Sequence, residues 1–531
     1  MKKIRTSLAV TMFVLSFVLV TLAVAPLMAQ DWPMFGQNAS NTATTTGTDL
    51  STNNVYKLKP KWTFTTGGDI SARAAVVNNV AYFPDWGGYL WAVNASNGKA
   101  VWSHQLSDYG LPSHTHARST PAISGGTLYI GTQEGAWMLA INAATGALRW
   151  KTQLESADPY AIITTSPTVS GGVVFEGVAS TAEGASIYGI NISAAPPRGS
   201  AVAINATTGA ILWKTYTVPV GYTGGGVWGS NPVVDAARNT VFIGTGNNYT
   251  HPTDPGYLAC INAGGSEDSC LSPDDHVDSV VALNMTTGVV KWAKRLTTWH
   301  QYGISDGSDD WNVDCILPAL GYPVGPQCPS NSGPDYDFGS APNEITYQTS
   351  TGPKTIIGAG QKSGIYYALD PDTGGLLWQT QVGPGSALGG MEWGSASDGK
   401  RIYVTIANLY GIGYQGYAGN AGSFSALDPA TGAILWQTAD PNGAVDIGPL
   451  AVANGVVFGS SMAGAATAPT MLAFDATTGN VLWSFSAGVS VNAGATIVQD
   501  TVYWGSGYTH LGFPGQTGGS NKFFAFTPNG T

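Results

Sequence analysis

One short pattern recurs along this chain and limits the possible folds more than any other feature of the sequence. In each copy an Ala is followed six residues later by Gly and ten residues later by Trp. Successive Trp residues of the pattern are 40 to 86 positions apart when Trp62 is counted as the first. Recurrence of this kind indicates repeated structural units. The seven Ala residues are Ala92, Ala140, Ala203, Ala282, Ala368, Ala426 and Ala473.

Each copy has a clear physical interpretation. The residues up to the Asn or Asp that follows the Ala are expected to form a buried strand. Most copies continue as Asn/Asp-x-x-Thr-Gly, which favours a turn because the Asx side chain bonds forward and Gly accepts positive φ. The next strand is predicted to end in the Trp, whose ring docks against the neighbouring unit. The spacing suits four-stranded blades joined by loops of different lengths.

An eighth copy is divided between the two ends of the chain. Residues 523–530 contain Ala525 and the turn, and residues 59–64 contain Trp62, the missing aromatic residue. A blade built from both ends closes a ring and removes exposed sheet edges. We therefore predict an all-β fold: a single eight-bladed β-propeller over residues 30–531 with tryptophan-docking motifs, closed by pairing of N- and C-terminal strands.

Composition agrees with many short strands and excludes several other classes. Gly accounts for 70 of the 531 residues, charged residues for only 10%, and the chain contains 17 Trp and 23 Tyr. These values argue against a coiled coil, a helical bundle and a disordered chain. The formal net charge is −11 and no Lys/Arg-rich run is present. We therefore expect no nucleic-acid partner and no attraction to an anionic membrane.

The first 29 residues have the pattern of a secretory signal peptide. Lys2, Lys3 and Arg5 precede a long apolar run over 8–25, and the small-residue ending at Ala29 suggests cleavage there. The length of the run leaves an uncleaved membrane anchor as the alternative. No Cys follows the run, which excludes a bacterial lipoprotein anchor. The predicted mature protein is periplasmic or secreted and has no membrane contact after cleavage.

The four cysteines fit an oxidising compartment. They form two closely spaced pairs, which suit two local disulfides, although four Cys permit three connectivities. A zinc site is less favoured because no CxxC or Cys/His spacing occurs, and the absence of CxxCH excludes a covalently attached haem. The residues are Cys260, Cys270, Cys315 and Cys328.

The repeat resembles the tryptophan-docking motif of the pyrroloquinoline quinone (PQQ) alcohol dehydrogenases, and the likeness covers nearly the whole chain after the signal peptide. Non-enzymatic outer-membrane assembly propellers share this repeat, so segments outside it are more specific. Four of them are most similar to the polyvinyl alcohol dehydrogenase branch. They are residues 274–279, 335–343, 358–364 and 388–394.

The resemblance implies a PQQ site. Trp228, which lies outside the repeat, matches the indole beneath the flat PQQ ring. Lys362 matches the basic residue over the quinone carbonyls, where a cation stabilises charge that develops on reduction. Arg118 matches the Arg that binds a PQQ carboxylate, and Thr164 and Ser180 match hydroxyl donors to the other carboxylates.

The same resemblance implies a calcium ion and a catalytic base. Glu183 and Asn247 match the metal ligands, and Asp337 matches the base that takes the alcohol proton beside the metal. Each residue type is also common in polar loops, and for Asn247 that interpretation competes. Lanthanide-dependent relatives carry a second Asp two residues after the base, where this chain has Gly339. Calcium is therefore the predicted metal.

This chain departs from methanol-type relatives above the cofactor. The adjacent Cys-Cys pair that caps PQQ in those enzymes is missing here. His114, His116 and Trp393 are the candidates for the upper face, with Trp393 assigned to cofactor binding. Glu392 precedes Trp393 where such relatives tend to have Asn.

The favoured hypothesis is a quinoprotein dehydrogenase that oxidises secondary alcohols, in polyvinyl alcohol or its oligomers, to ketones. Electrons then pass to a separate cytochrome c or another acceptor. Two alternatives remain open: the same chemistry on a smaller alcohol, and a non-catalytic propeller that acts as a protein-binding scaffold. The sequence makes no prediction of oligomeric state.

Overall fold

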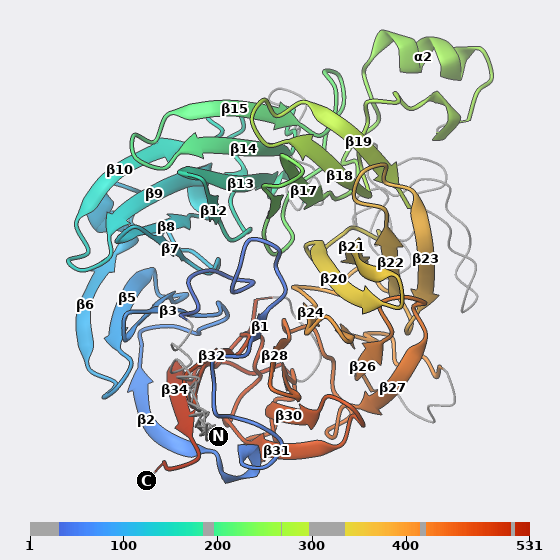
Figure 1. Ribbon diagram of the computed structural model, residues 1–531. Helices are drawn as coiled ribbons and strands as arrows, with labels where there is room; N and C mark the ends of the chain where they lie inside the picture. The colour runs from blue at the N-terminus through green and yellow to red at the C-terminus, as the bar shows by residue number, and fades with distance from the viewer. Residues whose placement is uncertain are drawn as a thin grey trace, which may run out of the picture.

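The computed structural model describes residues 31–183, 196–266, 268–296, 335–414, 421–510 and 516–530. Within these residues, eight sheets stand around a central axis as the blades of one propeller (Figure 1). The predicted eight-bladed, all-β fold is confirmed. The predicted signal peptide, residues 1–29, lies outside the described residues. No helix in the described part of the chain is long and apolar enough to cross a membrane.

The strands of each blade are given from the inside outwards. The first four blades are β3 (Ala75–Val77), β4 (Val80–Pro84), β5 (Tyr89–Asn94) and β6 (Ala100–Gln105); β7 (Ala122–Ser124), β8 (Thr127–Gly131), β9 (Trp137–Asn142) and β10 (Leu148–Gln153); β12 (Thr168–Ser170), β13 (Val173–Ser180), β14 (Ser200–Asn205) and β15 (Ile211–Tyr216), with β11 (Ala161–Ile162) also on β13; and β16 (Val233–Asp235), β17 (Thr240–Gly244), β18 (Ser279–Asn284) and β19 (Val290–Arg295).

The remaining elements follow the same order. The other four blades are β20 (Asn343–Thr349), β21 (Gly352–Gly360), β22 (Ile365–Leu369) and β23 (Leu376–Gln381); β24 (Ala396–Ser397), β25 (Ile402–Ile406), β26 (Ser423–Leu427) and β27 (Ile434–Ala439); β28 (Ala451–Ala453), β29 (Val456–Ser460), β30 (Met471–Asp475) and β31 (Val481–Phe485), with β1 (Thr44–Thr45) parallel to β28; and β32 (Thr496–Val498), β33 (Thr501–Gly505), β34 (Lys522–Thr527) and β2 (Lys59–Thr65). The described helices are α2 (Pro255–Asn262) and four 3₁₀ turns, Val55–Lys57, Leu106–Tyr109, Glu134–Ala136 and Asp268–Cys270.

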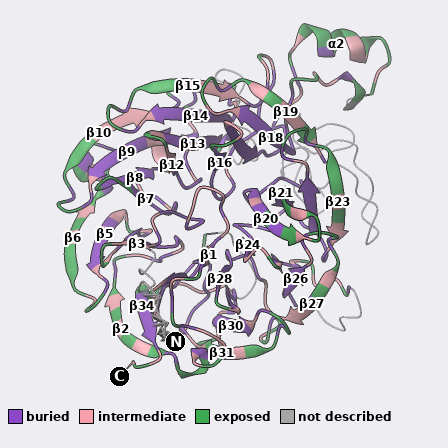
Figure 2. Ribbon diagram, in the orientation of Figure 1, coloured by how far each residue is buried: buried purple, intermediate pink, exposed green. Residues whose placement is uncertain are grey.

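Burial explains which strand carries which part of the repeat. The third strand of each blade, which holds the repeat Ala, is mostly buried, while the outer strand is mostly intermediate or exposed (Figure 2). The prediction that the outer strand ends in the Trp is wrong. Trp102 is the third residue of β6, which continues to Gln105 because His104 and Gln105 still pair with β5.

All eight docking tryptophans bind the adjacent blade in the same way. Each indole Nε1 donates a hydrogen bond to a main-chain carbonyl next door, as in Trp292 to Pro371 O at 3.2 Å. The repeat Gly lies directly under the ring: Gly374 has φ +69°, and a Cβ there would come within 2.6 Å of Trp292. A side chain at that position would displace the indole. The other seven bonds join Trp62 to Ala95, Trp102 to Ala143, Trp150 to Ala206, Trp213 to Met285, Trp378 to Pro429, Trp436 to Ala476 and Trp483 to Leu58.

The ring closes as the divided repeat predicts. β2, near the start of the described chain, pairs antiparallel with β34 near its end, and Trp62 lies opposite Ala525. Trp483 of the preceding blade completes the closure by its bond to Leu58 O. The closing blade therefore has the same cross-strand register as the others.

Residues 32–45 form a plug, which the sequence did not predict. This segment crosses the centre of the ring (Figure 1) and bonds in turn to the innermost strands of six blades. Site residues lie in the loops that lead into these strands: Arg118 precedes Ile123 of β7, Trp228 precedes Val234 of β16 and Trp393 precedes Ser397 of β24. Phe35 of the plug lines the same small cavity as Arg118, Thr164 and Trp393, so the plug lies directly against the candidate site. The bonds pair Trp32 with Val76, Pro33 with Ile123, Ala39 with Val234, Ser40 with Glu344, Thr42 with Ser397 and Ala43 with Val452.

Arg73 fastens the plug to the channel wall. Its fully buried guanidinium donates to the carbonyls of Phe35, Pro449 and Leu450 at 2.6, 3.3 and 2.7 Å, and burial lowers the pKa of Arg73 to about 9. Replacement of Arg73 by Met is expected to lower the free energy of unfolding by about 3 kcal/mol or more, since three buried carbonyls lose their donor.

Urea unfolding followed by tryptophan fluorescence measures this loss. Arg149→Met is the matched control, because Arg149 is exposed and makes a single 3.3 Å bond to Gly126 O. A change of about 0.5 kcal/mol or less is expected for the control. Equal effects of the two substitutions would refute the fastening role of Arg73.

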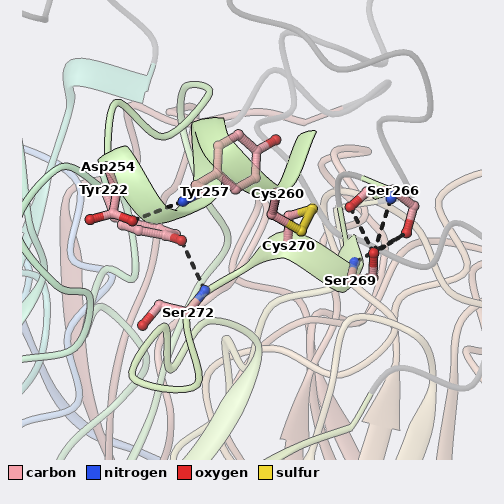
Figure 3. Close-up of a disulfide and its surroundings, with 8 residues drawn as sticks. All are labelled: Tyr222, Asp254, Tyr257, Cys260, Ser266, Ser269, Cys270 and Ser272. Atoms are coloured by element: carbon pink, nitrogen blue, oxygen red, sulfur yellow. Dashed lines mark hydrogen bonds between the residues drawn. A yellow bond between two sulfur atoms is a disulfide. The ribbon is translucent and has the colours of Figure 1, made fainter. Parts of the chain in front are cut away.

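An excursion from the fourth blade carries one of the predicted disulfides. A disulfide joins Cys260 of α2 to Cys270 of the following 3₁₀ turn (Figure 3), and α2 projects from the ring (Figure 1). Asp254 caps this helix by accepting from Tyr257 N, and Ser272 N donates to the Tyr222 hydroxyl at the base of the loop. Cys315 and Cys328, the other predicted pair, lie outside the described residues.

Candidate active site

Three loops of the fourth and fifth blades bring predicted cofactor, metal and catalytic residues together. Trp228 lies before β16, Asn247 follows β17, and Asp337 precedes β20. Main-chain hydrogen bonds tie these loops to one another, because Gly246 N donates to Gly226 O and Phe338 N to Thr245 O. The loops are thus held in a fixed relation by the backbone.

Lys362 is the charged centre of this cluster. It follows β21, and its main-chain N–H donates to Asp337 O at 3.0 Å. Its Nζ lies 3.4 Å from both Asp335 carboxylate oxygens and 3.5 Å from Asp337 Oδ2. All three side chains are almost completely buried. The result is a buried lysine shared between two carboxylates.

Burial and charge act on Lys362 in opposite directions. Burial lowers the pKa of this lysine, but the Asp335 and Asp337 carboxylates raise it more, so the pKa is well above its usual value. Lys362 therefore stays cationic at neutral pH. Such a fixed charge stabilises negative charge that develops beside it.

Trp228 forms one wall of the cluster. Its Nε1 donates to Asp337 Oδ2 at 2.6 Å, and Lys362 Nζ lies 5.1 Å from the centre of its ring. Asp337 Oδ1 is buried and has no hydrogen-bond partner among the described residues. One oxygen of Asp337 is therefore held by Trp228 and Lys362, while the other is available to accept a proton.

The predicted carboxylate-binding residues lie deeper, around a cavity of about 30 Å³ that Arg118, Thr164 and Trp393 line together. The Arg118 guanidinium lies 4.0 Å over the Trp393 ring, which meets Trp228 edge-on at 5.4 Å. Thr164 Oγ1 donates to Trp228 O at 2.9 Å. Ser180 ends β13, and its hydroxyl accepts from Ala182 N. Arg118, Thr164 and Trp393 thus share one wall with Trp228.

The predicted metal ligands approach the same place. Asn247 is buried, and its amide Nδ2 donates to Asp335 Oδ1 at 3.1 Å, which turns its carbonyl oxygen away from that carboxylate. Glu183 acts electrostatically on both Lys362 and the buried Tyr249. Burial, and then the carboxylates around it, raise the pKa of the Tyr249 hydroxyl well above its usual value.

The donor set fits a hard cation. Glu183, Asn247 and Asp337 offer carboxylate and amide oxygens, and the unpartnered Asp337 Oδ1 is a buried acceptor. Among the described residues, no three His, Cys, Asp or Glu side chains gather as a metal cluster. The predicted calcium ligands include only two such side chains, Glu183 and Asp337, so the absence of a three-residue cluster does not test the predicted calcium site.

Histidine and aromatic rings lie beside the region around Trp228, Trp393, Arg118 and Lys362, which is called the chamber below; Trp86 packs in one apolar cluster with Trp228 and Trp393. His116, a candidate for the upper face, lies 4.8 Å from the Trp86 ring and binds Glu134 Oε1 through Nδ1 at 2.7 Å. Burial lowers the pKa of His116, but Glu134 raises it more, so the net shift is upward. Trp86 in turn stacks on His510 at 3.6 Å. His114 is exposed and lines a separate outer cavity.

Sequence reasoning did not assign Asp335, Trp86 or His510 to the site. Asp335 lies two residues before the predicted base, within a segment already recognised as informative, and has φ +62°. The signal in the sequence was a pair of Asp residues, Asp335 and Asp337, separated by a single residue. Trp86 and His510 belong to loops far apart in sequence and carry no motif.

Comparison with known proteins identifies the group. The chain is 30% identical over 522 residues to a polyvinylalcohol dehydrogenase from Pseudomonas sp., covering 90% of this chain and 73% of that protein. The chain belongs to the quinoprotein alcohol dehydrogenase family. Another polyvinylalcohol dehydrogenase, from Sphingopyxis sp. strain 113P3, is 28% identical over 88% of this chain and 70% of its own length. This family member is thus an enzyme of the alcohol dehydrogenase class.

Solved structures support the fold. A quinohemoprotein alcohol dehydrogenase from Pseudomonas putida HK5 superposes with a TM-score of 0.70 at 18% identity, covering 94% of this chain and 81% of that one. A family model described as outer membrane protein assembly factor BamB matches residues 52–189 and 361–521. The match omits the stretch that contains Trp228, Asn247 and Asp337. This family member therefore shares the propeller repeat with that model, while several of its candidate site residues lie outside the matched ranges.

Proposed function

We propose that this protein oxidises secondary alcohol groups, in polyvinyl alcohol or its oligomers, to ketones with PQQ and Ca²⁺ bound beside Asp337. The observation that carries this proposal is the buried cluster of Trp228, Asp337 and Lys362, in which one carboxylate oxygen has no partner. The printed names of the relatives support the substrate class.

Each side chain has a defined task in this proposal. When bound, PQQ supplies a quinone that accepts a hydride and Ca²⁺ supplies Lewis acidity. Trp228 offers a flat surface for the ring, while Arg118, Thr164 and Ser180 bind its carboxylates, and Trp393 supports Arg118 from below. Glu183, Asn247 and Asp337 hold the metal.

Asp337 accepts the proton of the alcohol, and Lys362 stabilises negative charge. Asp337 Oδ1, held in place by the bond from Trp228 to Oδ2, takes the hydroxyl proton of the alcohol. Lys362 remains protonated and offsets negative charge on the oxygens next to it. The product ketone then leaves while the electrons pass to a separate cytochrome c or another acceptor.

Reconstitution tests the proposal directly. The purified protein is incubated with PQQ and Ca²⁺, and dye reduction is followed with secondary alcohols and with polyvinyl alcohol. Reduction that needs both additions supports the dehydrogenase, and the ranking of alcohols distinguishes a polymer from a smaller alcohol. Absence of both PQQ binding and turnover would favour the scaffold alternative, whose repeat the BamB model matches.

The cellular location is part of the same proposal. We infer export to the periplasm or beyond with removal of residues 1–29, and one domain over residues 30–531. N-terminal sequencing of the protein recovered from the producing cell tests both points. A retained residue 1–29 segment in a membrane fraction would contradict cleavage.

Asp335 is expected to orient the Asn247 amide. Replacement of Asp335 by Asn should weaken Ca²⁺ binding by about 10- to 100-fold, since the amide of Asn247 loses its charged acceptor and Lys362 loses a counter-charge. Calorimetric titration with Ca²⁺ measures the change. Asp372→Asn, at an exposed carboxylate, is the control and should bind Ca²⁺ like the wild type.

A further inference from the structure

Glu392 is a buried carboxyl group that the proposed mechanism does not use. It lies before β24, is 5% exposed, and is enclosed by two glycines. A Cβ at Gly339 would collide with its Oε2 and would lie 2.7 Å from Trp228 Cη2, and a Cβ at Gly389 would lie 2.8 Å from its Cγ. The glycines thus leave room for this carboxyl at the edge of the Trp228 ring.

One oxygen of this carboxyl has no protein partner. Glu392 Oε2 is buried and accepts or donates no hydrogen bond among the described residues. A buried polar group without a partner is costly, so proteins rarely leave one unused. Its position beside Trp228, in the proposed cofactor chamber, indicates that the missing partner is the bound ligand.

The surroundings favour the protonated form of this carboxyl. Burial raises the pKa of Glu392 to about 7, Asp337 acts in the same direction, and Lys362 and Arg118 oppose them. Tyr508 is the other titratable group that interacts with it. The carboxylates of a bound ligand favour the proton-bearing acid, while the Ca²⁺ proposed beside Asp337 acts in the opposite direction.

We propose that Glu392 binds the cofactor as a neutral acid, donating a hydrogen bond from its carboxyl O–H to an oxygen of the ring bound against Trp228. The inference rests on the proposed function, because it requires a quinone ligand in this chamber. A neutral acid can donate where an amide would. An ionised Glu392 would instead repel an electron-rich oxygen.

The test is the pH dependence of PQQ affinity with Ca²⁺ held constant, measured by quenching of tryptophan fluorescence. If only the protonated form binds well, wild-type affinity should fall about tenfold between pH 6 and pH 8. Glu392→Gln keeps a donor and cannot ionise, so its affinity should change less than about twofold. Glu344→Gln, at a half-buried carboxyl on β20 outside the chamber, should follow the wild type.

Each outcome is decisive. A flat wild-type curve overturns the proposal even if the Gln variant does not fold. Affinity that rises with pH, together with weak binding by Glu392→Gln, would show that the ionised carboxylate binds, for example to the metal, and also overturns it. Failure of the wild type to bind PQQ at pH 6 would instead refute the proposed function itself.

Discussion

Replacement of Asp337 by Asn is expected to lower kcat by about a thousandfold while PQQ still binds. The amide keeps one oxygen that can accept from Trp228 Nε1, as Asp337 Oδ2 does at 2.6 Å, so the ring wall is preserved. An amide cannot take the hydroxyl proton, and the chemical step is lost. Single-turnover dye reduction with the PQQ- and Ca²⁺-loaded variant measures the change.

Two comparisons make this result interpretable. Asp428→Asn, at a partly exposed Asp in a repeat turn, should retain wild-type turnover. Fluorescence quenching by PQQ should match the wild type within about threefold in Asp337→Asn, because a carboxylate is replaced by a group of the same shape. Full activity of Asp337→Asn would refute its assignment as the base.

The second large effect is expected for Lys362→Met. This change leaves the Asp335 and Asp337 carboxylates buried without the cation that lies 3.4 and 3.5 Å from them. Loss of one partner of a buried ion pair costs about 3–5 kcal/mol of folding free energy. Turnover should fall as well, since no fixed positive charge remains beside the reacting oxygens. Denaturant unfolding and dye reduction give the two values.

The pH dependence gives an independent check on this variant. The raised pKa of Lys362 shows that its charged form is favoured in the fold, so its contribution is present throughout neutral pH and is lost only as pH rises through that value. Without the lysine, the two carboxylates repel each other until one is protonated. The stability deficit should therefore be smaller at pH 5 than at pH 7.

Lys354→Met is the matched control. Lys354 lies on β21, the strand that precedes Lys362, and is exposed. Its replacement should change stability by about 0.5 kcal/mol or less. A deficit for Lys362→Met that does not depend on pH would contradict the charge-pair explanation, even if the variant were unstable.

The repeat predicted the fold because every blade needs a buried Ala, a turn Gly and a docking Trp at fixed positions. In each copy the Gly lies six residues and the Trp ten residues after the Ala, and the contact then joins neighbouring copies, as Gly374 with φ +69° does beneath Trp292. The same spacing, divided between Trp62 and Ala525, also predicted the closing blade. The plug of residues 32–45 contains no copy of the repeat, so the sequence pattern did not predict it.

The site could be predicted only in part. Trp228, Asp337 and Lys362 were placed through resemblance of short segments, and the structure brings them into contact. The contacts within this cluster could not be predicted from the sequence, because they join residues far apart in the chain. Trp228 and Asp337 are 109 positions apart, and Lys362 and Asp335 are 27 positions apart. No local spacing encodes such pairs.

The sequence by itself determined the number of blades, the closure of the ring and the residue types available for chemistry. The tertiary structure decided which of those residues act together. Burial sets the strength of every charge in the chamber, and burial arises only when loops from separate blades meet around one axis. That is why burial raises the pKa of Glu392, an ordinary acidic residue in the sequence, to about 7 in the folded ring.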